Sequence, residues 1–290
     1  MNVIGLGKAG CAIAEKFGEY PQYKIFQIDV GLENDFDFVK SYEDSNAGKK
    51  TYNVKKQPGP EEYEANVPSL KTFFGDITSE TFFVIGGSGD ISAMSLRIIE
   101  QIREKCEIFV LYIVPNRTLL SEKRKMHEKV TYNVLQQYAR SGAVKRIFLI
   151  SNPELENVLG DVPIMGYYDK LNDLIASTFH MINVFKNSEP VMGGLREPGL
   201  TRRICTVGIY DIEKDEEKLF FSLDTIRELG YIYSVGETKL REDGSLHKKI
   251  VTQMKEKTSD ETIDVSFGVF PTKYEDDYGY LLAYSPNIQS

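Results

Sequence analysis

Short apolar runs alternate with amphipathic stretches along the first half of the chain. The runs have the length and composition of buried strands, and the stretches between them carry apolar residues at helical spacing. Strands are therefore predicted at 2–5, 23–30, 82–85, 107–114 and 144–150, and helices at 8–18, 94–105 and 121–140. Because strands that alternate with helices form right-handed parallel crossovers, we expect an α/β fold with a mostly parallel sheet and helices on both faces.

The chain between the second and third predicted strands has a less regular pattern. Residues 31–60 are polar and rich in Asn, Asp, Lys and Gly, which predicts irregular connections. Residues 61–74 are compatible with a helix. No further strand is expected in this region before residue 82.

The pattern changes after residue 166. Residues 167–186 predict one long helix, and residues 187–199 contain three glycines and two prolines, which predicts a loop. Strands are expected beyond it at 204–212, 231–236, 263–271 and 278–284, with a helix at 245–257. The predicted organisation is a parallel-sheet domain over 1–166, a central helix over 167–187 and a smaller α+β domain over 188–290.

Composition and charge narrow the possible functions. The formal charge of −8 argues against sequence-independent binding to nucleic acid, which requires a basic surface. Cys11, Cys106 and Cys205 are widely spaced and form no metal-binding or redox motif, as expected in a reducing cytosol. The first predicted strand follows Met1 almost directly, which leaves no room for a signal peptide, and no apolar run approaches the ~20 residues that span a bilayer. We therefore expect a cytoplasmic protein without a direct nucleic-acid or membrane partner.

The first predicted strand ends in a glycine turn. Gly5, Gly7 and Gly10 have the spacing of the dinucleotide-binding fingerprint, and Asp29 follows about 20 residues later at the end of the second strand. Taken alone, this pattern indicates an NAD(P)-binding oxidoreductase, although no catalytic acid or base is recognisable downstream. A tight turn without a ligand is the alternative interpretation.

A second glycine turn follows the strand at 82–85 and precedes a predicted helix. It consists of Gly86, Gly87, Ser88, Gly89 and Asp90. Glycines allow the backbone to approach a ligand closely, and the free amides of a helix start attract anions. A dinucleotide site does not need this second turn, whereas a site that surrounds one triphosphate with several loops does. The two turns together therefore favour a mononucleotide site.

This pair of turns resembles the tubulin/FtsZ family, which combines an N-terminal glycine turn with a G-G-G-T-G-T/S-G turn. The resemblance implies nucleotide contacts, besides Asp29, from the first turn: Gly5, Gly7, Lys8, Ala9, Gly10 and Cys11. In the second turn, residues 86–89 match the middle of the motif, while Ile85, Asp90 and Ile91 depart from it. An aspartate that faces phosphates requires a cation between them, and Asp90 is otherwise placed to cap the following helix.

Two later segments resemble the family's motifs in the family's order. Residues 121–126 (SEKRKM) resemble its E-G-x-x-R segment, in which Glu122 would bind ribose and Arg124 the phosphates. An ordinary charged helix end is the alternative. Residues 150–153 (ISNP) resemble its I-P-N turn, which would place Asn152 against the nucleotide.

The start of the predicted long helix resembles the family's F-G-A-A-N-D-V-L motif. By this resemblance Tyr168 would stack on guanine, and Asn172 and Asp173 would read the edge of the base. A tyrosine ring offers a flat stacking face, and a carboxylate accepts the hydrogen bonds that guanine N1 and N2 donate. The alternative is that Tyr168 is a core residue and that Asn172 and Asp173 only start a helix.

The family's loop after the central helix carries N-x-D-x-x-D carboxylates, which one subunit inserts against the nucleotide of the next. That spacing is absent from residues 187–198 (NSEPVMGGLREP), where Glu189 and Glu197 are the remaining candidates for catalysis. Ordinary solvated loop residues are the alternative. The three histidines, at 127, 180 and 247, show no arrangement that indicates catalysis.

The resemblance implies a GTP-binding cytoskeletal protein. It would bind GTP or GDP with Mg²⁺ in the 1–166 domain and assemble with copies of itself, head to tail, into filaments. Because the catalytic loop departs from the family, hydrolysis would be slow, rearranged or lost. The alternatives are a non-hydrolysing structural or regulatory relative and the NAD(P)-binding oxidoreductase.

Overall fold

The structure is a computed structural model that describes residues 1–40, 48–75 and 77–290, and of 36–40 the backbone alone. The centre of its N-terminal half consists of buried strands: β1 (Asn2–Leu6), β2 (Lys24–Asp29), β5 (Thr81–Gly86), β6 (Ile108–Val114) and β7 (Arg146–Ser151). They pair in parallel in the order β2-β1-β5-β6-β7. The apolar runs become strands that are buried on both faces, which confirms the predicted α/β class.

Two further strands extend the sheet beyond β2, and the prediction of irregular connections for 31–60 was wrong there. β4 (Gly48–Asn53) pairs in parallel with β2, and β3 (Asp35–Lys40) runs antiparallel beside it. β4 needs no apolar run because most of it is only partly buried, and its pairing with β2 satisfies backbone groups near the sheet edge. The part of the prediction at 41–47 lies outside the described residues.

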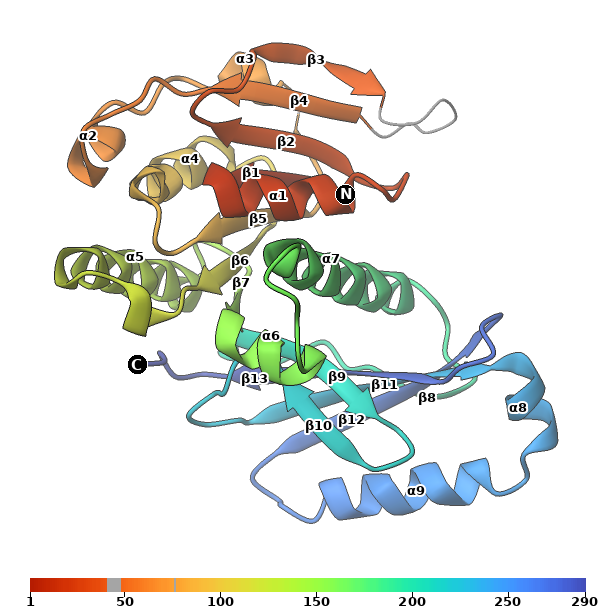
Figure 1. Ribbon diagram of the computed structural model, residues 1–290. Helices are drawn as coiled ribbons and strands as arrows, with labels where there is room; N and C mark the ends of the chain where they lie inside the picture. The colour runs from red at the N-terminus through yellow and green to blue at the C-terminus, as the bar shows by residue number, and fades with distance from the viewer. Residues whose placement is uncertain (41–47, 76) are drawn as a thin grey trace.

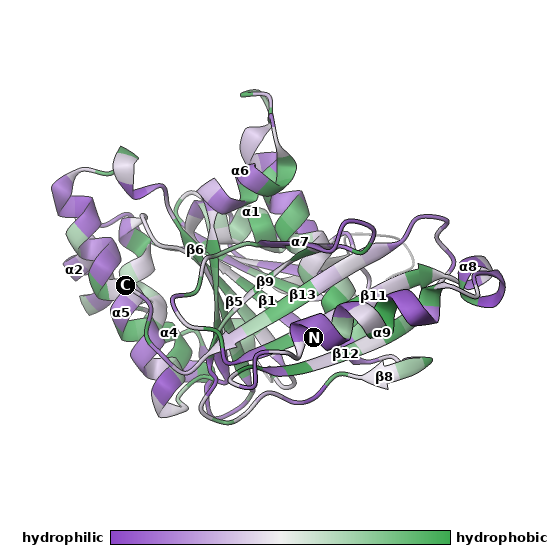
Figure 2. Cartoon of the chain, turned by 90° about the horizontal axis from the view of Figure 1, so that it is seen from below, coloured by the Kyte–Doolittle hydropathy of each residue, from purple (hydrophilic) through white to green (hydrophobic). Residues whose placement is uncertain are grey.

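Helices cover both faces of the sheet (Figure 1). One face carries α1 (Gly7–Phe17), α6 (Asn152–Leu159) and α7 (Tyr167–Lys186). The other face carries α3 (Lys71–Phe74), α4 (Ser95–Ile102), α5 (Glu122–Ser141) and α9 (Leu246–Lys257). Figure 2 shows the hydrophobic colour concentrated in the strands between these layers.

Short elements replace two of the expected helices. The helix expected at 61–74 is divided into α2 (Pro60–Ala65) and α3, because Pro68 disfavours a continuous helix. A 3₁₀ helix, η1 (Asp90–Met94), precedes α4. Another, η2 (Arg117–Leu119), lies between β6 and α5. Within the described part of the chain, no helix is both long enough and apolar enough to cross a membrane.

The C-terminal part continues the same sheet. β9 (Ile204–Asp211) joins the halves by pairing in parallel with β7, with Ile147 opposite Ile204 and Phe148 opposite Cys205. The further strands are β8 (Met192–Gly194), β10 (Glu216–Leu219), β11 (Glu228–Gly236), β12 (Asp264–Thr272) and β13 (Tyr278–Ser285). Their order beyond β9 is β13-β11-β12-β8, and β10 pairs with β9. α8 (Glu237–Glu242), which was not predicted, leads from β11 toward α9.

α7 packs against both halves of the molecule. Ile175 and Phe179 are buried with side chains of the N-terminal strands. At the other end of the helix, the Phe185 ring lies 5.0 Å from the Phe270 ring and 6.0 Å from the Tyr280 ring, measured between centroids. The long helix predicted at 167–186 is therefore confirmed, and its apolar face connects the two parts of the sheet.

The turn after α1 contacts the middle of α7 through His180. The Tyr20 ring stacks on the imidazole with centroids 3.7 Å apart. Gln22 Nε2 lies 3.1 Å from His180 Nδ1, and the Tyr23 hydroxyl lies 3.3 Å from the same atom while it accepts from Asn183 Nδ2 at 3.2 Å. Nδ1 accepts from both groups only while it carries no proton, and burial lowers the pKa of His180.

We expect acid to destabilise the fold through His180. Its folded-state pKa lies below the unfolded value of about 6.5, so the unfolded chain binds the proton first. The stabilisation by neutral His180 is therefore lost as the pH falls below that value. The free energy of unfolding, measured with urea at pH values of about 7.5 and about 5.5, should fall further for the wild type than for His180→Gln, which cannot gain this charge. An identical fall in both proteins would contradict the prediction.

Candidate functional site

The parallel strands β1, β5, β6 and β7 all end at one edge of the sheet, so the loops that follow them lie together. Both glycine turns are at this edge. A Cβ atom added to Gly10 would lie 2.4 Å from the carbonyl oxygen of Val84, and one added to Gly5 would lie 2.4 Å from the carbonyl oxygen of Gly10. Only glycine permits these approaches, so the first turn of α1 lies directly against β1 and β5.

The second glycine turn joins β5 to η1 and lies beside the first. A Cβ atom added to Gly86 would lie 3.0 Å from Ala9 Cβ. The turn is held by Ser92 Oγ, which donates to the carbonyl oxygen of Gly86 at 2.5 Å. The N-cap of η1 is Gly89, and no side chain makes a capping hydrogen bond there. Asp90 follows it and is exposed, so it does not cap this helix.

Ile91 takes the position of the motif's last glycine, and its side chain lies between the two turns. A Cβ atom added to Gly7 would lie 2.7 Å from Ile91 Cγ2, and Gly7 itself has a φ of +70°. Ile91 is only 8% exposed. The space beside the first turn of α1 is therefore narrower than a glycine at position 91 would leave it.

A cavity of about 330 Å³ opens beside the second glycine turn. Its lining comes from this turn, η1, α2, α4 and α5, and includes Ser88, Gly89, Asp90 and Arg124. The volume is at the lower end of the range for ligand pockets. The structure therefore brings Arg124 together with the second glycine turn.

Two buried polar atoms of the lining lack a hydrogen-bond partner among the residues that the structure describes. They are Ser95 Oγ and His127 Nε2. Buried polar groups normally have a partner, so this part of the cavity suits a polar ligand or an ordered water. Neither Ser95 nor His127 was predicted from the sequence as a site residue. The available signal was that His127 lies three positions after Arg124, on the same side of α5.

Glu122 is not part of this lining. Its side chain is 90% exposed and accepts from Lys125 Nζ at 2.7 Å. The hydroxyl of Ser121 caps α5 by accepting from the Arg124 amide at 3.5 Å. The start of α5 therefore contributes Arg124 to the cavity. Glu122 forms an ordinary ion pair on the surface of the helix, as the alternative interpretation expected.

The other candidates of the first turn lie close to the ends of β1 and β2. The Cys11 thiol donates to the carbonyl oxygen of Gly5 at 3.4 Å, and burial raises the pKa of Cys11 to about 12, so this thiol is neutral and unreactive. Asp29 ends β2 and accepts from the Val30 amide at 2.8 Å. Burial raises the pKa of Asp29, and the positive charge of Lys8 opposes that rise.

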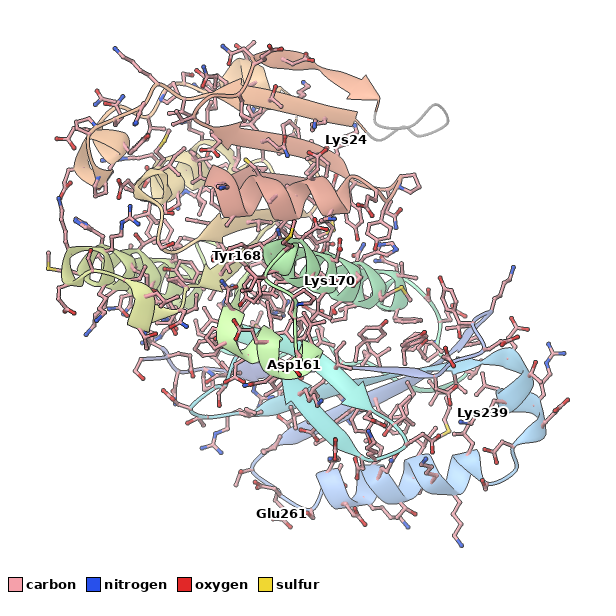
Figure 3. The ribbon with its side chains drawn as sticks, in the orientation of Figure 1. Lys24, Asp161, Tyr168, Lys170, Lys239 and Glu261 are labelled. Atoms are coloured by element: carbon pink, nitrogen blue, oxygen red, sulfur yellow. The ribbon has the colours of Figure 1, made fainter. Side chains whose placement is uncertain are left out.

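The starts of α6 and α7 complete this edge. Asn152 begins α6 directly after β7. Tyr168 lies in the first turn of α7 (Figure 3) and is 68% exposed, so the interpretation of Tyr168 as a core residue was wrong. Its ring packs edge-on against that of Tyr167, with centroids 5.0 Å apart. The exposed face of Tyr168 is available for stacking.

The polar residues expected to read guanine lie on two different faces of α7. Asp173 Oδ1 is 2.8 Å from Lys16 Nζ at the end of α1, and Asp169 Oδ1 is 2.9 Å from the same atom. Asn172 follows Tyr168 by four residues and therefore shares its face of the helix. The structure groups Asn172 with Tyr168, and Asp173 with Lys16.

The two candidate catalytic carboxylates lie after the C-terminal end of α7. Glu197 accepts from Arg146 Nη2 at 2.8 Å, and Arg146 is the first residue of β7, at the edge opposite the glycine turns. Burial raises the pKa of Glu197, but the hydrogen bond and charge of Arg146 outweigh this effect, so the pKa of Glu197 is lowered.

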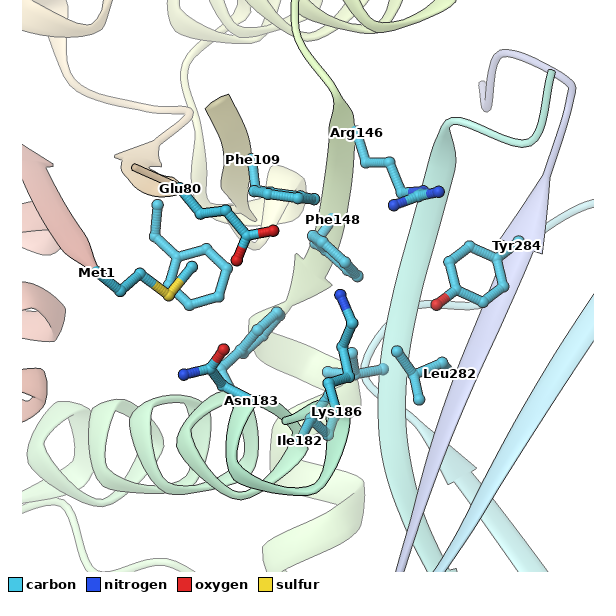
Figure 4. A pocket seen from close by; sticks show the side chains of 13 residues that line it. Met1, Glu80, Phe109, Arg146, Phe148, Ile182, Asn183, Lys186, Leu282 and Tyr284 are labelled. Atoms are coloured by element: carbon cyan, nitrogen blue, oxygen red, sulfur yellow. The ribbon is translucent and has the colours of Figure 1, made fainter. Parts of the chain in front are cut away.

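Arg146 also lines a small cavity with Tyr284 and Lys186 (Figure 4). The cavity has a volume of about 30 Å³, which is room for water. Glu189 is exposed in the loop.

Comparison with known proteins finds similarity in structure and not in sequence. No family model and no curated protein sequence matches the chain. The chain is similar to TubZ from Bacillus thuringiensis serovar israelensis in a GTPγS-form protofilament, with a TM-score of 0.72 and 15% identity over 98% of this chain and 86% of that one. It is also similar to GTPγS-bound CetZ2 from Haloferax volcanii, with a TM-score of 0.67, 14% identity and coverage of 98% and 93%. For FtsZ from M. jannaschii, the TM-score is 0.66, the identity 12% and the coverage 98% and 87%.

These similarities define the class of fold. The chain has the fold of the tubulin/FtsZ family, as its glycine turns and long central helix suggested. Within that class it resembles plasmid-type TubZ, because the type III plasmid segregation protein TubZ is also similar, with a TM-score of 0.69 and 16% identity over 98% of this chain and 87% of that one. At these identities the comparison establishes the fold alone.

We expect Gly10→Ala to lower the free energy of unfolding by about 1–3 kcal/mol, the usual cost of overpacking. The added Cβ atom would collide with the carbonyl oxygen of Val84. Gly244→Ala is the matched control, because a Cβ atom there meets nothing within 4 Å. Thermal unfolding of both variants measures the difference. Equal melting temperatures would show that α1 does not depend on the close approach at Gly10.

Proposed function

We propose that the protein binds a guanine nucleotide at the carboxyl edge of its parallel sheet and assembles with copies of itself, head to tail, into filaments. The observation that carries the proposal is the gathering of two glycine turns, Asn152 and the exposed ring of Tyr168 at one edge of a tubulin/FtsZ fold. Structures similar to this chain include GDP-form and GTPγS-form protofilaments of TubZ and filament models of TubZ, which supports both parts of the proposal.

The described residues fit a nucleotide in three ways. The close approaches at Gly5, Gly10 and Gly86 hold the two glycine turns and the start of α1 together at one edge, and the first amides of a helix are groups that bind phosphates. Arg124 brings a positive charge to the cavity beside the second turn, and Ser95 Oγ and His127 Nε2 there lack partners. When bound, Mg²⁺ would supply the positive charge that Asp90 and a triphosphate, both negative, require between them.

We further propose that hydrolysis is slow. The family's carboxylate spacing is absent, and Glu197 is held by Arg146 of its own chain. Ile91 also narrows the space beside the first turn of α1. The same three observations favour the second candidate, a filament-forming relative that binds GTP without hydrolysing it. GTPase activity that rises steeply with protein concentration would exclude that candidate.

The NAD(P)-binding oxidoreductase has less support. It rests on the spacing of Gly5, Gly7 and Gly10 with Asp29, and it gives no role to the second glycine turn or to Tyr168. We also propose that 1–166, 167–187 and 188–290 act as the nucleotide-binding unit, the central helix and the second domain. A protein of this kind would work in the cytoplasm.

We expect Tyr168→Ala to weaken the affinity for GTP and GDP by about tenfold or more, because stacking of a base on an aromatic ring contributes about 1–3 kcal/mol. Tyr168→Phe keeps the stacking face and should retain the affinity. Isothermal titration calorimetry measures both. Tyr274→Ala is the control, since this tyrosine is 60% exposed but lies in the C-terminal half.

Sedimentation and electron microscopy with and without GTP test the filaments. We expect filaments with GTP for the wild type and fewer for Tyr168→Ala at the same nucleotide concentration. Wild-type protein that binds neither GTP nor GDP would overturn the proposed function, and NAD-dependent thermal stabilisation would then favour the oxidoreductase.

A further inference from the structure

A buried carboxylate lies between the second glycine turn and α5. Glu128 of α5 is 1% exposed, and both of its oxygens accept hydrogen bonds. Oε1 accepts from the hydroxyl of Tyr112 in β6 at 3.1 Å and from Nη2 of Arg117 in η2 at 3.3 Å, and Oε2 accepts from Arg117 Nε at 2.9 Å. An arginine that reaches both oxygens of a carboxylate fixes its orientation as well as its charge. The charge of Glu128 is therefore paired and hydrogen-bonded, as a buried charge must be.

Tyr112 joins this ion pair to the second glycine turn. A Cβ atom added to Gly87 would lie 2.3 Å from the hydroxyl oxygen of Tyr112 and 2.8 Å from its Cζ. The backbone of the turn therefore rests on the end of this side chain. Burial and the charge of Glu128 raise the pKa of Tyr112 well above its usual value, so the hydroxyl keeps its proton and donates it in the hydrogen bond to Glu128.

The network connects two walls of the cavity of about 330 Å³. One wall is the second glycine turn, which Tyr112 supports at Gly87, and the other is α5, which Glu128 holds. Arg124 is four residues before Glu128 and lies one turn earlier on the same face of α5, and it lines the cavity together with Gly87. The hydrogen bonds of the turn to Ser92 and to β6 do not reach α5. The separation between the turn and Arg124 is therefore set through Tyr112 and Glu128.

We propose that Tyr112, Glu128 and Arg117 are positioning residues for the phosphates of the bound nucleotide. They touch no ligand themselves, and they hold the second glycine turn and Arg124 at the separation at which both reach the phosphates. This inference rests on the proposed function and deepens it. Arg117 belongs to the segment between β6 and α5, and without it Glu128 would be buried with no cation, so this segment and α5 move as one unit.

The test compares GTP with guanosine, which lacks the phosphates. The ratio of the two affinities reports what the phosphates contribute, and isothermal titration calorimetry measures it, with guanosine in competition with GTP. Tyr112→Phe removes only the hydroxyl, and Glu128→Gln keeps the shape of the side chain and removes its charge. Each should lower the ratio by about tenfold, the equivalent of one hydrogen bond to a charged group, and leave the affinity for guanosine unchanged. Because both act through one contact, the double variant should resemble Glu128→Gln alone.

Two further variants calibrate the result. Tyr132→Phe also removes the hydroxyl of a buried tyrosine, whose ring centroid is 5.5 Å from that of Tyr112. Among the described residues that hydroxyl has no hydrogen bond to Glu128, so the ratio should equal that of the wild type. Tyr168→Ala should weaken the binding of GTP and guanosine alike, because its ring is proposed to stack on the base. Circular dichroism and thermal melting show which variants are folded, and Tyr112→Phe decides the test by itself if Glu128→Gln does not fold.

Three results would overturn the inference. An unchanged ratio in folded Tyr112→Phe and Glu128→Gln would mean that the turn keeps its place without the network. An equal loss of affinity for GTP and guanosine would mean that the network supports the fold in general and not the phosphate end. Multiplying effects in the double variant would mean that Tyr112 and Glu128 act separately. Wild-type protein that binds neither GTP nor guanosine would overturn the proposed function together with this inference, which distinguishes the two failures.

Discussion

The burial of α7 across the sheet determines where the parts of the candidate site lie. The helix packs with Ile175 and Phe179 on the N-terminal strands, and its end reaches Phe270 in the C-terminal part. Tyr168 lies at the beginning of α7, and the loop after the end of α7 leads to the Glu197–Arg146 pair at the opposite edge. Because one rigid helix joins these positions, a shift of α7 relative to the sheet would alter both edges together. The hydrophobic core therefore links the edge of the glycine turns to the opposite edge, which in the proposed function would be the nucleotide edge and the surface that meets the next subunit.

The departures from the family's motifs are consistent with one another in physical terms. Ile91 fills space against Gly7, and Asp90 adds a negative charge beside the second glycine turn. At the other edge, ionised Glu197 pairs with the buried Arg146, and displacing it would leave the charge of Arg146 buried without an ionic partner. In the proposed function, each change would make hydrolysis harder and leave the base-binding end at the start of α7 unaltered. The proposal of retained nucleotide binding with slow hydrolysis accounts for the changes at Ile91, Asp90 and Glu197 together. The loss of a single residue would not.

The sequence predicted the parts of the fold that have a strong local signal. The central strands and α7 were correct, because apolar runs and helical spacing reflect burial directly. β4 was missed, since a strand near a sheet edge is held by backbone pairing and needs no apolar pattern. β3 was missed although its sequence, DFDFVK, alternates charged and apolar residues. At the site, the glycine turns and Tyr168 were recognisable from their motifs. The pairing of Asp173 with Lys16 was not, because these residues are far apart in sequence and meet only where α1 packs on α7.

The proposed head-to-tail assembly requires two different surfaces, one at each end of the subunit, and three of the most exposed large apolar residues lie at two opposite edges. Ile164 and Met165 are 94% and 92% exposed in the loop that leads into α7, at the edge of the glycine turns. Leu200 is 81% exposed near the start of β7, at the opposite edge. Large apolar side chains exposed to this degree cost free energy in an isolated subunit, and burial against a second copy would recover it. Since the two groups differ in sequence and lie at opposite edges, a contact between them is heterologous and continues from copy to copy, as a filament requires.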